Sequence, residues 1–104
     1  MAFTGNEGEQ ISLALAHDMT KNYRDSVAQG DTQAHFFGMN IINSILAQTG
    51  VVGIRMYYGI DENGAKQLVL VGTDANENDL YEGIIADRSV RCPPVCGGSN
   101  PLNS

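Results

Sequence analysis

The hydrophobic and polar positions along the chain separate a helical first half from an extended second half. Between residues 6 and 29, apolar residues recur at every fourth position, as a helix with one buried stripe requires. Thr4 and Glu7 have the spacing of a capping box, and Gly30 supplies a C-terminal stop. The pattern predicts a helix over residues 6–29, with its stripe formed by Ile11, Leu15, Met19, Tyr23 and Val27.

A second helix is predicted over residues 32–48. Asp31 is a suitable N-cap and Gly50 closes the far end. The apolar face consists of Ala34, Phe37, Ile41, Ile42, Ile45 and Leu46. Phe36 lies off this face, and two interpretations stay open for it. Either it packs against a loop or the C-terminal tail, or it belongs to a surface that meets a partner.

Two strands follow, joined by a turn. Strict alternation predicts a strand over residues 51–60, and Asn63-Gly64 is a strong hairpin signal before a second strand over residues 65–73. The side chains expected to face the helices are Val52, Ile54, Met56, Tyr58 and Ile60. Residues 68–71 of the second strand are apolar on both faces, so we expect the tail or another subunit to cover the outer face.

The rest of the chain contributes little regular structure. Residues 84–86 form one more apolar patch, which we interpret as a third short strand. Residues 91–104 are rich in Pro, Gly, Ser and Asn, so an irregular tail is expected there. The predicted fold class is therefore α+β, with two N-terminal helices packed on a small antiparallel sheet. We expect residues 1–104 to form a single domain.

The charge narrows the classes of partner. The net charge is −6 and the six basic residues are scattered. Binding to nucleic acid or to an anionic membrane surface requires clustered Lys or Arg, so neither is expected. No apolar run is long enough to span a membrane, and the N-terminus does not have the pattern of a signal peptide. These features favour the cytoplasm.

The two cysteines are the first candidate site. Cys92 and Cys96 flank Pro93, Pro94 and Val95. A Cys2His2 zinc site is one hypothesis, because His17 and His35 supply the two further ligands that a structural zinc requires. The alternative is that the cysteines anchor the tail by packing or by a disulfide. No helix is expected to follow them, so the setting of a redox dithiol is missing.

The second candidate is a polar stretch with a partial calcium-loop pattern. Asp74, Asn76 and Asn78 place oxygen ligands at alternate positions, with Glu82 as a further ligand. The pattern then departs from a calcium loop, because the glycine and the bidentate glutamate are absent at their required positions. An ordinary turn is the competing interpretation, since Asp and Asn are common turn residues.

No residues are spaced as a known catalytic motif requires, so an enzyme is not expected.

The third candidate site is a contact surface. Arg55 and Tyr57 alternate on the outer face of the first strand, and both residue types are favoured at interfaces. Val69 and Val71 lie on the two-sided apolar strand beside them. We expect Arg55, Tyr57, Val69, Val71, Phe36 and the tail around Cys92–Cys96 to form contacts between chains.

Two stretches together resemble a group of short, uncharacterised bacterial proteins. The first is the hairpin that contains Gly-Ile-Arg-Met-Tyr-Tyr-Gly over residues 53–59 and continues through residues 67–74. The second is the tail with Cys-Pro-Pro-Val-Cys-Gly over residues 92–97 and Asn-Pro-Leu-Asn over residues 100–103. The resemblance covers roughly the second half of the chain. It implies the fold and carries no activity, cofactor or site residue.

The sequence therefore favours a non-catalytic protein that assembles with copies of itself or with another protein. Open edges of a small sheet are able to pair with another chain. The alternative is a small-ligand or metal-binding module that uses Cys92 and Cys96 with His17 and His35. No cofactor is expected unless zinc occupies that site.

Overall fold

The computed structural model describes residues 2–104. These residues form two compact units, each built from two separate stretches of the chain. The first, called here the sheet unit, comprises residues 2–7 and 37–89. The second, called the tail unit, comprises residues 8–36 and 90–104. The sequence did not predict this division. No helix among the described residues is long and apolar enough to cross a membrane.

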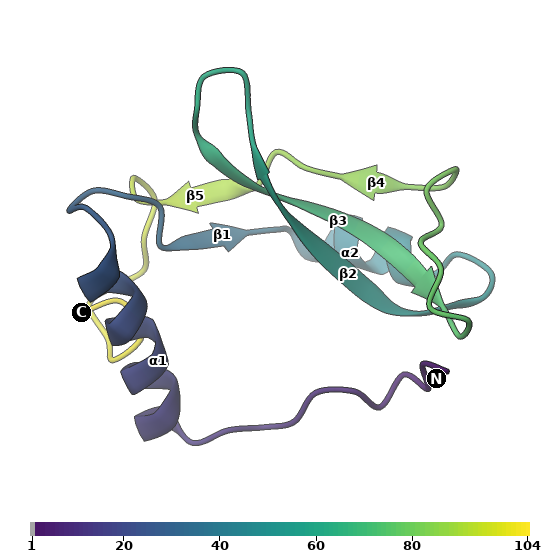
Figure 1. Ribbon diagram of the computed structural model, residues 1–104, viewed down its shortest axis with the longest axis horizontal. Coiled ribbons are helices and arrows are strands. Elements are labelled where there is room, and N and C mark those ends of the chain that lie inside the picture. The colour runs from purple at the N-terminus through teal and green to yellow at the C-terminus, as the bar shows by residue number, and fades with distance from the viewer. Residues whose placement is uncertain (1) are drawn as a thin grey trace. The chain divides into compact units, whose positions relative to one another are not determined.

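The sheet unit is built on three antiparallel strands in the order β2-β3-β4 (Figure 1). β2 spans Val51–Ile60, β3 spans Lys66–Asp74 and β4 spans Ile85–Ala86. Gly64, at the turn between β2 and β3, has a φ of 82°, which a glycine adopts at little cost. The structure confirms the predicted hairpin, and it confirms the third strand in a shorter form.

The core of the sheet unit lies between the sheet and α2, which spans Met39–Leu46. Ile45 of α2 and Leu70 of β3 are completely buried. Gln48 fastens the end of α2 to the segment before β4. Its Nε2 donates to the carbonyl oxygen of Ile45 at 2.9 Å, and its Oε1 accepts from the amide of Ile84 at 2.9 Å. The partly buried residues around this core are Phe37, Ile41, Ile54, Leu68 and Ile84.

The tail unit combines α1 (Leu13–Ser26) with a two-stranded sheet. Its strands are β1 (Ala34–Phe36) and β5 (Val90–Cys92), which pair in antiparallel register. The tail was expected to lack regular structure from residue 91 on. Its first two residues instead belong to β5, and turns follow from residue 93.

The first predicted helix is shorter than expected. α1 begins only after Ser12, whose Oγ accepts from the amide of Leu15 at 3.1 Å and so acts as the N-cap. The predicted contact of Thr4 with Glu7 does form, with the Thr4 amide donating to Glu7 Oε2 at 2.9 Å. It closes a local turn, and no helix follows, because Gly8 adopts a φ of 93° that interrupts helical geometry.

The second predicted helix is wrong over its first half. Residues 34–36 form β1, and only residues 39–46 are helical. These residues pair with β5 instead of forming a helical turn, because Phe36 lies opposite Val90 and Ala34 opposite Cys92. Gly38, which lies within the range of the predicted helix, is the N-cap of α2.

The predicted packing of two N-terminal helices on one sheet is matched only in part. α1 belongs to the tail unit, whereas α2 is the helix that packs on the three-stranded sheet. The fold class itself, α+β, is confirmed.

Candidate functional site

Three polar side chains meet on one face of the hairpin in the sheet unit. Arg55 and Tyr57 point to the same face of β2 because they are two residues apart. Arg55 Nη1 donates to Asp79 Oδ1 at 2.7 Å and to the carbonyl oxygen of Glu77 at 3.3 Å. The Tyr57 hydroxyl donates to Asp79 Oδ2. Each oxygen of the Asp79 carboxylate therefore has its own donor.

The network also fixes the segment that follows β3. Asp79 forms an antiparallel bridge with Thr73, and the Thr73 hydroxyl donates to Asp79 Oδ1 at 3.3 Å. The hydroxyl of Tyr57 and the positive charge of Arg55 hold the pKa of Asp79 below its ordinary value. The carboxylate is therefore charged at neutral pH and ties β2 to the segment beyond β3.

Phe3 of the same unit lies against the face of the hairpin that carries Arg55 and Val71. The cross-strand partner of Val71 is Arg55, and the Arg55 guanidinium lies 5.5 Å from the centre of the Phe3 ring. The Phe3 amide donates to the carbonyl oxygen of Ala75 at 2.9 Å, which holds the N-terminal segment in place. Val71 is only 4% exposed in the single chain, so its burial does not require another subunit.

The residues of the predicted contact surface therefore lie in different surroundings. Val71 is buried, Val69 is half-buried, and Arg55 and Tyr57 are bound to Asp79 within the chain. Phe36 is well exposed on β1, at 66%, and belongs to the tail unit. The structure does not bring these five residues together on one open surface of either unit.

An exposed apolar row lies on the opposite face of β2. Met56, Tyr58 and Ile60 are 58%, 95% and 75% exposed, although alternation predicted that they face the helices. Ile54, earlier in the same row, does pack against the core. The alternation correctly placed these residues on one face of β2. It carried no information on how far along the strand α2 covers that face. Within the described residues β2 pairs only with β3, so its other edge carries no strand partner.

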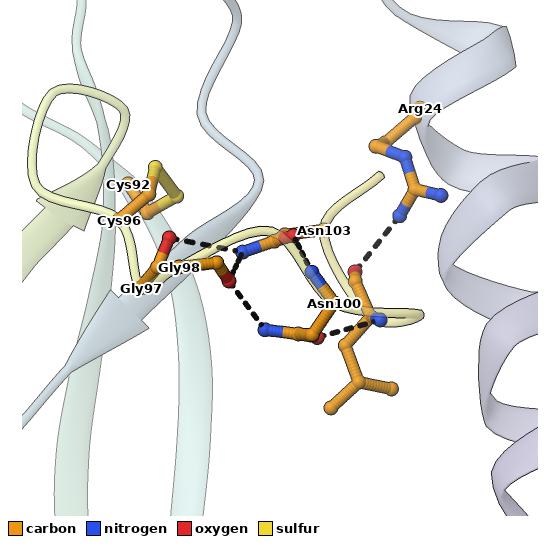
Figure 2. The surroundings of a disulfide bond; sticks show 8 residues. Arg24, Cys92, Cys96, Gly97, Gly98, Asn100 and Asn103 are labelled. Atoms are coloured by element: carbon orange, nitrogen blue, oxygen red, sulfur yellow. Dashed lines mark hydrogen bonds between the residues drawn. A yellow bond between two sulfur atoms is a disulfide. The ribbon is translucent and has the colours of Figure 1, made fainter.

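The tail is folded by its own side chains (Figure 2). Cys92 and Cys96 form a disulfide. The Asn103 side chain donates to the carbonyl oxygens of Gly97 at 3.4 Å and Gly98 at 3.2 Å, and its Oδ1 accepts from the Asn100 amide at 2.9 Å. These bonds hold residues 97–103 in a defined loop without a helix or a strand.

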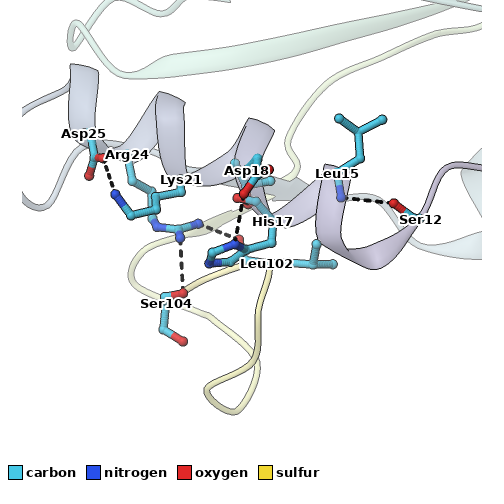
Figure 3. A network of polar contacts seen from close by, with 10 residues as sticks. Ser12, Leu15, His17, Asp18, Lys21, Arg24, Asp25, Leu102 and Ser104 are labelled. Atoms are coloured by element: carbon cyan, nitrogen blue, oxygen red, sulfur yellow. Dashed lines mark hydrogen bonds and ion pairs between the residues drawn. The ribbon is translucent and has the colours of Figure 1, made fainter.

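Arg24 of α1 binds the end of the tail (Figure 3). Its Nη1 donates to the carbonyl oxygen of Leu102 at 2.8 Å, and its Nη2 donates to a backbone oxygen of Ser104 at 3.2 Å. The neighbouring Lys21 forms an ion pair with Asp25 at 2.7 Å. Between α1, the β1–β5 sheet and the tail lies an open hollow of about 890 Å³.

The zinc set proposed from the sequence is not assembled. Cys92 and Cys96 are bonded to each other, His17 lies 3.5 Å from the Asp18 carboxylate, and His35 stands on β1. Across residues 2–104, no group of three His, Cys, Asp or Glu side chains is placed to hold a metal ion. The disulfide was one of the two alternatives left open by the sequence.

The calcium-like stretch is a turn closed on itself. Asp74 Oδ1 accepts from the amides of Asn76 at 2.9 Å and Asn78 at 3.0 Å. The Asp74 amide in turn donates to the carbonyl oxygen of Asn78 at 3.0 Å. The oxygen expected to bind calcium is thus used by the backbone, and Glu82 takes no part in these hydrogen bonds.

Comparison with known proteins gives no family. The chain matches no protein-family model, no curated protein and no solved structure.

Proposed function

We propose that this protein works by self-association, and that the free edge of β2 is the surface through which copies of the chain pair. The observation that carries the proposal is a ten-residue apolar edge strand that has no strand partner on one side. Such an edge presents a row of backbone donors and acceptors to any second strand. Addition of a strand at an open edge is a common mode of recognition.

The two edges of the sheet differ in how they limit pairing. β4, at one edge, has only two residues, which is too short to pair well with a strand of another chain. β2 contains no proline, lysine or carboxylate among its ten residues. Its single charge, on Arg55, is bound to Asp79 across the sheet. One of the usual devices that blunt an edge strand, an irregularity in register, occurs between Val51 and Gly53, at the start of β2. Proline, lysine and carboxylate, which blunt other edge strands, are missing from its whole length.

The exposed row beside this edge supplies the apolar area. Full burial of Tyr58 alone removes about 200 Å² from water. That is roughly a quarter of the ~800 Å² that each partner contributes to a standard interface. Pairing of β2 with β2 of a second copy would extend the sheet and place the two rows of Met56, Tyr58 and Ile60 next to each other. A two-fold arrangement of this kind is self-complementary and closes as a dimer.

A lysine at position 58 tests the proposal. Tyr58 is almost fully exposed, so Tyr58→Lys is compatible with a folded chain, whereas charged groups on an edge oppose pairing. We expect self-association at least tenfold weaker than in the unaltered protein, measured by sedimentation over a concentration series.

Tyr81→Lys is the matched control. Tyr81 is also an exposed tyrosine, at 71%, but it lies in the segment that follows β3 on the side away from β2. We expect this variant to associate as the unaltered protein does. Equal association of both lysine variants and the unaltered protein would show that the β2 edge is not the contact.

A further inference from the structure

We infer that the hollow of the tail unit binds a small organic anion with an apolar body, of the medium-chain carboxylate class. The site is separate from the β2 edge, and the inference does not depend on self-association. It uses residues of α1, β1, β5 and the tail, all of which belong to the tail unit.

The walls of the hollow are mainly apolar. Its volume of about 890 Å³ is within the range of small-molecule sites, which are lined by apolar side chains with a few polar groups. The apolar lining includes Met19, Tyr23, Phe36, Val90, Val95 and Leu102. Each of these six side chains keeps more than a third of its surface exposed. An apolar chain in the hollow would remove part of that surface from water.

The charge of the lining selects the sign of the ligand. The chain has 12 Asp and Glu residues against six Lys and Arg. None of the acidic residues lines the hollow among the described residues, whereas Arg24 does. The nearest carboxylate in sequence, Asp25, is paired with Lys21 at 2.7 Å. An acidic protein thus presents one permanent cation at the rim of an apolar hollow.

Arg24 retains capacity for an anion. A guanidinium has five N–H donors, and the two described bonds of Arg24, to the backbone of Leu102 and Ser104, leave others available. An arginine binds a carboxylate with charge-assisted hydrogen bonds. With a single cation, the site matches a monoanion better than a phosphate, which calls for more donors.

The walls are held in place before any ligand arrives. The Cys92–Cys96 disulfide and the side chains of Asn100 and Asn103 define the tail loop (Figure 2). Arg24 then joins this loop to α1 (Figure 3). A site formed in advance loses less entropy on binding, which favours affinity.

Decanoate and decanol, titrated by calorimetry, are the probes for this inference. They share an apolar chain and differ in charge. We expect decanoate to bind with saturation and at least tenfold more tightly than decanol. In Arg24→Gln this preference should fall to within about twofold, while decanol binding stays unchanged and shows that the hollow is intact. Arg91→Gln, which removes a cation of β5 that does not line the hollow, should keep the preference.

Val95→Asp gives a second, independent variant. Val95 is exposed in the loop closed by the disulfide, so the substitution places a carboxylate in the wall without disturbing a core. We expect decanoate affinity to fall at least tenfold, whereas Tyr58→Lys in the sheet unit leaves it unchanged. The inference is overturned if decanoate does not saturate, if decanol binds equally well, or if Arg24→Gln or Val95→Asp keeps the affinity of the unaltered protein.

Discussion

Single residues decide how closely the elements of the sheet unit approach one another, and Gly72 on β3 is the clearest case. A Cβ at this position would lie 2.8 Å from Cγ2 of Val51 and 3.3 Å from Cγ2 of Ile45. The first distance is shorter than carbon atoms tolerate, and Ile45 is completely buried. Glycine is therefore required at position 72 by the packing of α2 and β2 against β3.

Gly72→Ala should lower the free energy of unfolding by about 1–3 kcal/mol, the usual cost of overpacking a core. Gly53→Ala on β2 is the control, because a Cβ there meets no atom within 4 Å. This second change should be neutral or slightly stabilising, since glycine weakens a strand. Urea denaturation of both variants measures the difference, and equal stability of the two would contradict the packing described around Gly72.

Asp79 gives a prediction with a defined pH dependence. Its pKa in the folded chain is below the ordinary value of 3.8 because Tyr57 and Arg55 bind the charged form. Its stabilisation is therefore complete above pH 3.8 and is lost as the pH falls through the lower, folded-state pKa. Asp79→Asn should be less stable than the unaltered protein at pH 7, and the gap should narrow at acid pH.

Thermal unfolding of both proteins from pH 7 down to pH 2 measures this difference in stability. Tyr57→Phe removes one donor and keeps the charge pair, so we expect a smaller loss at pH 7. A gap between Asp79→Asn and the unaltered protein that stays constant over the whole range would show that the carboxylate charge contributes nothing.

The sequence identified Arg55 and Tyr57 as unusual but did not reveal their partner. Asp79 is 24 residues from Arg55 along the chain and 22 from Tyr57, and local patterns carry no information on such pairs. Its one local signal is its position at the end of a polar turn after β3. The same limit explains why the disulfide was only one of two open alternatives for Cys92 and Cys96.

Elements were predictable where the pattern was long and specific. β2 was predicted with its exact bounds, because ten alternating residues end at an Asn-Gly turn. The segment before α2 was mistaken for helix because Ala34 and Phe37 fit a helical period by themselves. Its strand character depends on β5, which is more than 50 residues away, and a local pattern does not report such pairing.

The disulfide should stabilise the loop that it closes in the tail unit. Closing a five-residue loop stabilises by about 2 kcal/mol in the chain-entropy account. Reduction should therefore speed hydrogen exchange at the Val95 amide, which donates to the Arg91 carbonyl oxygen at 3.0 Å, by roughly 30-fold. In the double variant Cys92→Ser/Cys96→Ser, the Val95 amide should exchange as fast as in the protein with its disulfide reduced, with or without reductant. An unchanged Val95 rate after reduction would mean that the hydrogen bonds alone hold the loop.

For the whole molecule, the sequence predicted the class α+β, but it did not predict two units. The division depends on which distant segments meet, since residues 8–36 join residues 90–104 while the sheet unit lies between them in sequence. Large apolar side chains remain exposed in both units, from Leu13 on α1 to Ile60 on β2. The pairing proposed here would cover Met56, Tyr58 and Ile60 among them.

The mass of the native protein in solution tests the central claim most directly. Light scattering behind a sizing column should give twice the chain mass of 11.2 kDa, and the mass should fall on dilution. Tyr58→Lys should shift the mass toward 11.2 kDa under the same conditions. A mass of 11.2 kDa for the unaltered protein at every concentration would contradict self-association through β2.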